Sequence, residues 1–508
     1  MHDEIAYLSA HELRTAYTRR ELSPVEVVRA LGDRIQALDA FLNTMTATSL
    51  ERALQAAQAS EQRYREGRPL PLDGVSVAVK DLIDTADLQT TYGSGMFAGH
   101  LPHRDAPVVR LVRAAGGVVI GKSATHEFAW GITTDNEHFG PTRNPWAPDR
   151  VPGGSSGGSA AALAAGLAPL ALGTDTAGSI RIPAAFCGVV GLKPTHGAVD
   201  GRGVFPLAPS LDHVGPMART VSDVRLLHSV ISKPDYRLHR GAPDPSSLAI
   251  KGLRVGICPD LDQIPLGSAA QAARDATAAA FTELGAQVVE VPAPDAPRLY
   301  ETLGAVVLAE GSRVHRRAGL WPGRGAEYGQ EVRSRLELAA IADADTYVDS
   351  HYERVRLHSV MHQILSAVDV LLSPVSAISP VPIGQDKLRH AGRQLPFREL
   401  VMTSTAPQSL TGLPACTVRA GFDEHGLPVG VQLTSPPRTE SRLLDIAEHL
   451  HRATEALQNR WPAVTMGRQR RCPPGGEASR TDAPDAPYRA TWRSPIPPAT
   501  GALPRGSH

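Results

Sequence analysis

Cysteine, aromatic residues and net charge are all scarce in this sequence. Four of its 508 residues are cysteines, far apart and without a CxxC pair, which argues against a disulfide scaffold and against structural zinc. Aromatic residues make up 5%, too few for the stacking surfaces that bind single-stranded nucleic acid. Lys+Arg and Asp+Glu both number 52, so no net field draws the chain to nucleic acid or to an anionic membrane.

Long apolar runs are missing as well. The longest, residues 160–173, is interrupted by Gly166 and Pro169 and is too short to cross a bilayer. The N-terminal residues MHDEIAYLSAHELR mix both charges and lack the apolar stretch of a secretory signal. The cysteines are interpreted as buried free thiols of a reducing compartment. We therefore expect a cytoplasmic protein without a bound metal. The cysteines are Cys187, Cys258, Cys416 and Cys472.

The sequence does contain an alternation of helix and strand patterns. Hydrophobic residues make up 42% and charged residues 20%, as in globular proteins. Ser23-Pro24-Val25-Glu26 is a capping box with proline at the first helical position. Helices are predicted from residue 24 and at 50–66, 107–115, 268–284 and 440–455, and strands at 75–79, 118–120, 253–257, 287–291 and 429–433. This order predicts an α/β protein with helices covering a mixed sheet.

One segment, GGVVIGKS at residues 116–123, fits the phosphate-loop pattern of nucleotide-binding proteins. In such a loop the middle residues wrap an anion with their N–H groups. Here the middle residues 118–120 are all β-branched and favour a strand, while the two leading glycines end the preceding helix. We therefore expect neither a nucleotide site nor a cofactor.

A second segment, GGSSGGS at residues 153–159, contains the G-x-S-x-G pattern twice, around Ser155 and around Ser156. In an α/β-hydrolase this pattern marks a nucleophile elbow. No long apolar strand leads into it, because the preceding residues are PWAPDR. Nineteen histidines are available, so a serine–histidine triad stays open at this point. A flexible linker is disfavoured because an Ala-rich helical run follows at once.

The same Gly/Ser loop belongs to a much longer pattern. Residues 151–195 read VPGGSSGGSAAALAAGLAPLALGTDTAGSIRIPAAFCGVVGLKPT. Upstream lie GVSVAVKDLIDT, which contains Lys80, and GPTRNPW, and downstream lie LDHVGPMART, TGLPACTV and GLPVGVQL. Residues 151–195 resemble the amidase signature family nearly letter for letter, and with the other segments the resemblance covers roughly residues 5–460, more weakly between 290 and 400. The spacings from Lys80 to Ser155 and from Ser155 to Ser179 match as well.

The resemblance implies the amidase signature fold, with a mixed β-sheet core and helices on both faces, and hydrolysis of a carboxamide C–N bond. Ser179 would attack the amide carbonyl and form an acyl-enzyme. Ser155, in a cis peptide conformation, would relay the proton to Lys80. The backbone N–H groups of Thr176, Ala177, Gly178 and Ser179 would form the oxyanion hole.

The residues themselves are consistent with this chemistry. A serine hydroxyl is a weak nucleophile and needs a base. A neutral lysine can act as that base where its surroundings depress its pKa. Lys80 ends a short apolar strand, which can carry it inward, and Asp81 should point to the opposite side.

Several positions in these motifs need a separate interpretation. Ala177 stands where the family usually has glycine, so its φ must be negative or strained. Gln408 stands where asparagine is expected before TGLPA. Arg181 is interpreted as a structural partner of Asp175. Cys187 lacks a partner that would stabilise a thiolate and is assigned to the core.

Two branches of the family, and one inactive class, are the candidates for function. One branch holds stand-alone amidases, and the other holds the A subunit of glutamyl-tRNA(Gln) amidotransferase, which releases ammonia from glutamine. Two differences from the A subunits favour a stand-alone enzyme. A subunits usually carry Gln at the position of Ile182. They also tend to have AFASSLDQIGP where this chain has FPLAPSLDHVGP, at residues 205–216. A catalytically inactive binding relative is disfavoured because all three relay residues are present.

The resemblance and the composition together give the expected partners and domains. The partner is a small-molecule amide, with no nucleic acid and no membrane, and a homodimer is an open alternative. The weakly matching residues 290–400 should contribute to the acyl pocket, so the sequence predicts no substrate-binding residues. The predicted organisation is an N-terminal helical region at 1–70, the catalytic domain at 71–466, and a disordered tail rich in Pro, Gly, Ser and Arg at 467–508.

Overall fold

The computed structural model describes residues 2–236 and 250–464. The predicted tail at 467–508 lies outside these residues. None of the described helices combines the length and the apolar character needed to cross a lipid bilayer. Cys187, Cys258 and Cys416 are buried free thiols, as predicted, and Cys472 is outside the described part.

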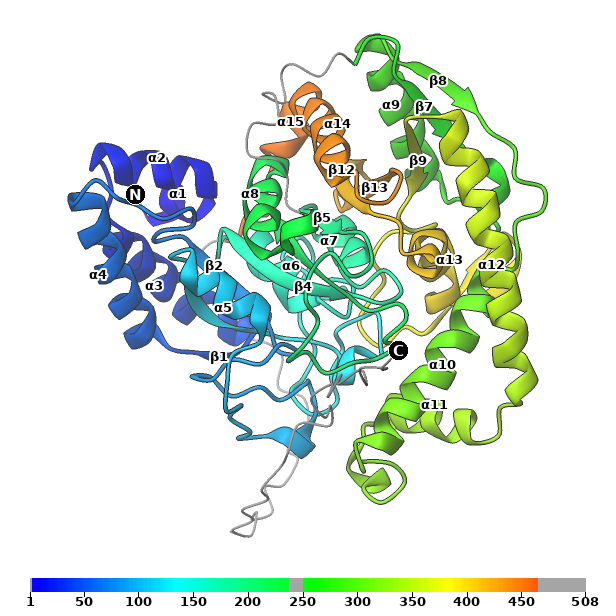
Figure 1. Cartoon of the computed structure of the whole chain (residues 1–508), viewed down its shortest axis with the longest axis horizontal. Helices are drawn as coiled ribbons and strands as arrows, with labels where there is room; N and C mark the ends of the chain where they lie inside the picture. Colours follow the sequence, from blue (N-terminus) through cyan, green and yellow to red (C-terminus); the bar gives the residue numbers. More distant parts are fainter. Residues whose placement is uncertain (1, 237–249, 465–508) are drawn as a thin grey trace, which may run out of the picture.

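A mixed sheet forms the centre of the molecule (Figure 1). Within the described residues it has eleven strands, in the order β1-β3-β2-β4-β6-β5-β12-β13-β9-β7-β8. The strands are β1 Met45–Thr48, β2 Ser76–Lys80, β3 Val118–Ser123, β4 Leu170–Asp175, β5 Val190–Lys193, β6 His213–Ala218, β7 Arg254–Ile257, β8 Gln287–Glu290, β9 Val370–Pro374, β12 Ala415–Phe422 and β13 Pro428–Thr434. A separate hairpin joins β10 Lys387–His390 and β11 Arg393–Pro396.

The pairing around β2 positions the residues that matter later. β2 runs parallel to both of its neighbours, β3 and β4, and all five of its residues are buried. Strands buried on both faces are typical of parallel pairing, in which helices cover the sheet on each side. The β7, β8 and β9 group is also parallel, whereas the other pairs in the sheet are antiparallel.

Helices cover both faces of the sheet, as predicted. Along β2, Val77 and Val79 pack into one hydrophobic cluster and Ala78 into another, because successive strand side chains point to opposite faces. The first face is covered by α5 Pro107–Ala114, α8 Val221–Ile231, α9 Ser268–Glu283 and α14 Glu440–Ala453. The second is covered by α3 Pro24–Leu42, α6 Gly157–Ala164 and α7 Arg181–Cys187.

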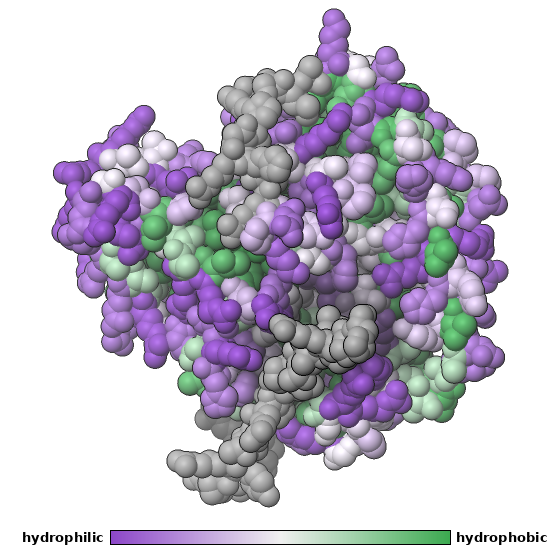
Figure 2. Space-filling model, viewed as in Figure 1, coloured by the Kyte–Doolittle hydropathy of each residue, from purple (hydrophilic) through white to green (hydrophobic). Residues whose placement is uncertain are grey.

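Two groups of helices lie at the ends of the sheet (Figure 1). At the N-terminal end α3 is joined by α1 His2–Tyr7, α2 Ala10–Arg19 and α4 Leu50–Arg65. At the other end α10 Leu299–Arg317, α11 Gln330–Ala340, α12 Ala344–Ala367 and α13 Phe397–Thr411 pack around a third hydrophobic cluster, and the short α15 Glu455–Gln458 follows α14. On the face seen in Figure 2, hydrophilic residues predominate and hydrophobic ones are scattered.

The local sequence signals account for these elements. Ser23 Oγ accepts the Glu26 N–H at 3.1 Å, and Glu26 accepts the Ser23 N–H at 2.8 Å, so the predicted capping box opens α3. The predicted strand and helix segments all appear as elements, among them 75–79 in β2 and 107–115 in α5. The middle residues 118–120 of the phosphate-loop pattern lie inside β3, so they form the predicted strand and not an anion-wrapping loop.

The first prediction concerns the close contact between α6 and the sheet. A Cβ on Gly158 would lie 2.4 Å from Ala124 N and 2.5 Å from Ala124 O, so Gly158→Ala should lower the free energy of unfolding by about 1–3 kcal/mol. Gly304 in α10 has no heavy atom within 4 Å of such a Cβ, so Gly304→Ala should raise it by about 0.5–1 kcal/mol. Urea unfolding curves of both variants check this, and equal midpoints would contradict it.

Candidate active site

Lys80, the last residue of β2, has a fully buried side chain. Its Nζ lies 2.8 Å from Ser155 Oγ, 2.9 Å from Ser156 Oγ and 2.7 Å from Thr174 Oγ1. Thr174 belongs to β4, which pairs in parallel with β2. The side-chain nitrogen therefore faces three hydroxyls and makes no hydrogen bond to a carboxylate within the described residues.

This environment determines the protonation of Lys80. Complete burial lowers the pKa of Lys80 well below its ordinary value, and the negative charges of Asp175 and Asp212 offset only part of that effect. A buried amine without a paired carboxylate favours its neutral form. Neutral Lys80 has a free lone pair and can act as a general base.

Ser155 lies in the sharp turn between residues 153 and 156. The Gly154–Ser155 peptide bond is cis, as the resemblance implied, and Gly153 has a φ of +80°. A Cβ on Gly154 would lie 2.7 Å from backbone atoms of Ile132 and Thr133, so this turn packs directly against a neighbouring backbone. Lys80 is the only residue that hydrogen-bonds to Ser155 Oγ within the described part of the chain.

Ser179 lies near the end of the turn between β4 and α7. Its carbonyl oxygen accepts the Ser156 N–H at 3.2 Å, which joins the two serine turns. The hydroxyl of Ser179 makes no hydrogen bond to Ser155 or to another described side chain, and the residue is 5% exposed. The structure thus brings Lys80 and Ser155 into contact, and places Ser179 on an adjoining turn with its hydroxyl unengaged.

The amides expected to form the oxyanion hole are not all free. The Gly178 N–H donates to Asp175 Oδ1 at 2.8 Å, and Gly178 has a φ of +119°. This amide is therefore engaged by the protein itself. The N–H groups of Ala177 and Ser179 have no hydrogen-bond acceptor among the described residues. Ala177 is not among the residues with positive φ, so its methyl group is accommodated without strain.

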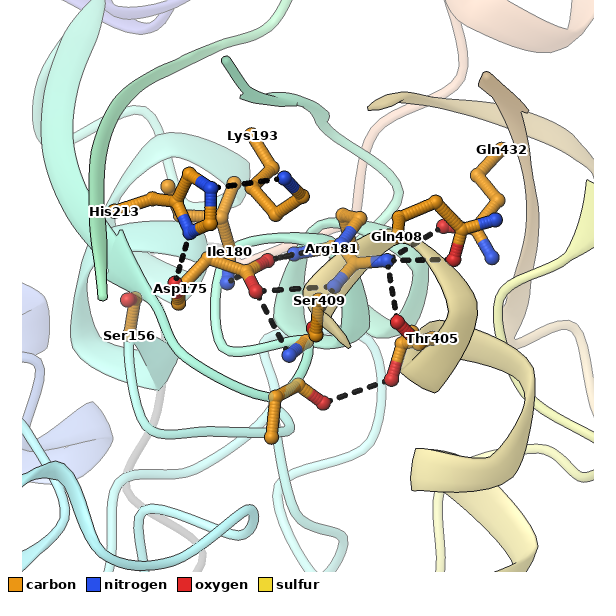
Figure 3. A network of polar contacts seen from close by, with 12 residues as sticks. Ser156, Asp175, Ile180, Arg181, Lys193, His213, Thr405, Gln408, Ser409 and Gln432 are labelled. Atoms are coloured by element: carbon orange, nitrogen blue, oxygen red, sulfur yellow. Dashed lines mark hydrogen bonds and ion pairs between the residues drawn. The ribbon is translucent and has the colours of Figure 1, made fainter. Parts of the chain in front are cut away.

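A buried ion pair holds this loop in place (Figure 3). Arg181 Nε and Nη2 each lie 3.0 Å from an oxygen of Asp175, and both side chains are fully buried. Burial alone would raise the pKa of Asp175, but the charge and hydrogen bonds of Arg181 outweigh it and hold that pKa well below its usual range. The predicted Arg181–Asp175 pairing is confirmed. Arg181 also donates to Gln408 Oε1 at 3.1 Å and to Gln432 Oε1 at 3.0 Å, so Gln408 supports the arginine.

Sequence reasoning missed several groups around the relay. Ser156 and Thr174 contact Lys80 directly, and only the pairing of β2 with β4 could have revealed Thr174. Lys193 Nζ lies 3.1 Å from His213 Nε2, and burial lowers the pKa of both groups well below their ordinary values. No described histidine side chain hydrogen-bonds to the hydroxyl of a relay serine, so the alternative serine–histidine triad has no geometric support.

A cavity of about 420 Å³ lies beside the relay. Thr174 and Thr176 line it, together with Asp212 and His213. Thr176 Oγ1 donates to Asp212 Oδ1 at 2.6 Å.

Among the described residues, no group of three or more His, Cys, Asp or Glu side chains is placed to hold a metal ion.

Comparison with known proteins gives consistent matches. The Amidase family profile matches residues 26–444. The A subunit of glutamyl-tRNA(Gln) amidotransferase from Chloroflexus aggregans is 38% identical over 481 residues, covering 89% of this chain and 97% of that protein. A solved chain from a vestigial protein complex, linked to the evolutionary origins of an s-triazine catabolic enzyme, is 33% identical with a TM-score of 0.82, covering 88% of this chain and 98% of that one. The solved A subunit of the amidotransferase from Thermotoga maritima is 29% identical with a TM-score of 0.71, covering 89% and 94%.

The second prediction concerns the buried ion pair. Arg181→Met leaves the Asp175 carboxylate buried without its partner, so it should lower the free energy of unfolding by about 3–5 kcal/mol. Arg65→Met removes an ion pair to Glu61 whose arginine side chain is 62% exposed, so it should cost about 0.5 kcal/mol. Urea denaturation at neutral pH distinguishes the two, and a loss for Arg181→Met as small as for Arg65→Met would show that Asp175 is stabilised by other groups.

Proposed function

The chain belongs to the amidase family, whose members hydrolyse C–N bonds, and we propose that it is a stand-alone amidase that uses a Lys80–Ser155–Ser179 relay. The observation that supports this most directly is the buried Lys80 amine, which is surrounded by hydroxyls and whose Nζ lies 2.8 Å from Ser155 Oγ. A lysine buried without a paired carboxylate gains no ion-pair stabilisation, so a base is its natural role.

In the proposed mechanism, Ser179 Oγ attacks the amide carbonyl while its proton moves through Ser155 to neutral Lys80. Lys80 returns a proton through Ser155 to the departing amine, which leaves the acyl group on Ser179. Water then attacks the acyl-enzyme with the same groups, releasing the carboxylic acid and restoring Ser179. The protonated Lys80 has three N–H donors, which match the three surrounding hydroxyl oxygens of Ser155, Ser156 and Thr174.

The hydrogen bonds also favour Ser155 over Ser156 as the relay group. Ser156 Oγ donates to Thr174 O at 3.1 Å and accepts the Thr174 N–H at 3.2 Å. Its proton is therefore committed to the backbone. Ser155 Oγ has Lys80 as its partner, and its proton can point either towards Lys80 or away from it.

The candidates for stabilising the oxyanion are the backbone amides of Thr176, Ala177 and Ser179. The amide of Gly178 is already hydrogen-bonded to Asp175.

A glutamine-hydrolysing A subunit of a tRNA-dependent amidotransferase is the second candidate function. The 38% identity to such a protein over 97% of its length supports it. Against it, the A subunit from Thermotoga maritima superimposes less closely, at a TM-score of 0.71, than the chain from the vestigial complex, at 0.82. Ile182 is fully buried, and a Cβ on Gly178 would lie 2.7 Å from it, so the residue that departs from that branch packs against the oxyanion loop.

The third prediction uses pH to test Lys80. Because the neutral amine is the base, kcat/KM should fall as pH drops through the depressed pKa of Lys80, and Lys80→Ala should be nearly inactive at pH 7. Thr174→Val removes an acceptor that stabilises the protonated lysine, so the acid limb of the profile should move to lower pH.

The matched control is Thr417→Val, because the buried Thr417 hydroxyl has no hydrogen-bond partner among the described residues. It should leave the profile unchanged. Normal activity of Lys80→Ala at pH 7 would remove Lys80 from the role of base.

The fourth prediction separates the two candidate functions. The purified chain alone, without partner proteins or ATP, should release ammonia or an amine from a simple amide. It should prefer some amide over glutamine by at least about tenfold in kcat/KM, which corresponds to about 1.4 kcal/mol in transition-state binding. An ammonia-release screen over an amide panel measures this, and activity only with glutamine and co-expressed partner proteins would establish the amidotransferase function instead.

A further inference from the structure

The cavity beside the relay has a floor made of residues that touch the catalytic groups. Thr174 lines the cavity, and its Oγ1 lies 2.7 Å from Lys80 Nζ. Thr176, also in the wall, belongs to the loop expected to form the oxyanion hole. A molecule that fills this cavity therefore ends against Thr174 and Thr176, one side chain away from Lys80, although the relay residues themselves do not line the cavity.

One of the two lining carboxylates, Asp212, lies at the floor of the cavity. Asp212 accepts a hydrogen bond from the Thr176 hydroxyl at 2.6 Å and others from the Leu207 and Ala208 N–H groups at 2.9 and 3.1 Å. Burial raises the pKa of Asp212, and these hydrogen bonds act in the opposite direction. An anionic group of a ligand would be repelled from this end, whereas an amide NH₂ would not.

The rim of the cavity is basic. Arg313 and Arg317 of α10 are four residues apart, on one face of the helix, and Lys233 follows α8. All three are exposed, and none forms an ion pair with a carboxylate in the ranges 2–236 and 250–464. Arg202, also in the lining, is neutralised by Asp200, with Nη2 and Oδ2 2.5 Å apart. Arg313 and Arg317 are thus left for a ligand by the described part of the chain, and Lys233 adds a third positive charge, which also acts electrostatically on Asp200.

Most of the remaining lining is apolar, apart from His196 and His213. The apolar residues include Leu82, Val199, Val204, Leu207, Val314 and Ala318. A charge is poorly stabilised in this apolar section, whereas methylene groups bury their surface there favourably. The cavity therefore matches a ligand with an uncharged, largely apolar centre and an anionic group at one end.

Resting on the amidase activity proposed above, we propose that the substrate is an amide whose far end is a carboxylate. The carboxylate binds Arg313, Arg317 and Lys233 at the rim, a short aliphatic spacer occupies the apolar section, and the scissile amide reaches the floor. Asp212 at the floor and the cations at the rim then fix the orientation of the substrate. Guanidinium groups suit this role because their planar N–H donors match a carboxylate.

The test compares two amides of similar length. Glutaramate ends in a carboxylate, whereas hexanamide is uncharged. The wild-type protein should favour glutaramate by at least about tenfold in kcat/KM, and added salt should reduce that preference because exposed charges are screened. In Arg313→Gln/Arg317→Gln the preference should fall towards one through a higher KM for glutaramate, with hexanamide turnover retained.

Arg316→Gln is the matched control, because Arg316 is an exposed arginine of the same helix that does not line the cavity. It should keep the wild-type preference. Arg313→Glu/Arg317→Glu should instead favour 6-aminohexanamide, whose end is positive. Equal rates on glutaramate and hexanamide in the wild type, or equal loss in Arg316→Gln, would overturn the proposal while leaving the amidase function intact.

A binding measurement keeps the two proposals distinguishable. Glutarate, the product of glutaramate hydrolysis, should bind the wild-type protein in calorimetry and lose at least about tenfold in affinity in Arg313→Gln/Arg317→Gln. Arginine-dependent glutarate binding without hydrolysis of any amide would support the anion site and contradict the amidase function. If the protein hydrolyses hexanamide but does not bind glutarate, the anion site is contradicted and the amidase function is not.

Discussion

The active site depends on one constraint, the burial of the Lys80 side-chain amine without a carboxylate to pair with it. An exposed lysine would be protonated at neutral pH and could not accept a proton. A lysine paired with an aspartate would be protonated too, because the ion pair stabilises the charge. Here Asp175 lies close enough to act on Lys80 electrostatically, but its oxygens are occupied by Arg181 and by the backbone of its own loop.

The Asp175–Arg181 pair therefore has two consequences. It fixes the loop between β4 and α7 that carries Ser179, and it engages the Asp175 carboxylate, which therefore does not pair with the Lys80 amine. The arginine is in turn held by Gln408, Gln432 and Ser409 from the opposite side of the site. A fully satisfied buried network of this kind defines a single arrangement, because each alternative leaves a buried polar group unpaired.

Much of this arrangement could be predicted from the sequence, and the exceptions have physical reasons. The capping box of α3 and the apolar β2 are local patterns, and they appear as predicted. The contact of Thr174 with Lys80 depends on the register of β2 against β4, which pairs Val79 with Leu172, and single-strand patterns do not contain register. The sequence patterns between residues 290 and 400 do not predict the individual helices there. In α12, Val348, Tyr352 and Val355 are exposed, so its apolar residues do not mark one buried face.

The parallel pairing of β2 with β4 has a consequence for how the protein is synthesised and folds. Parallel neighbours cannot be joined by a tight turn, and here β3 and α6 lie between them in the chain. The contacts of Lys80 with Ser155 and Thr174 are therefore long-range, and such contacts form late, after the entropy of closing a large loop has been overcome. Until that step Lys80 is solvated and protonated like any surface lysine. The nascent chain thus carries no reactive amine, and the base comes into existence together with the finished sheet.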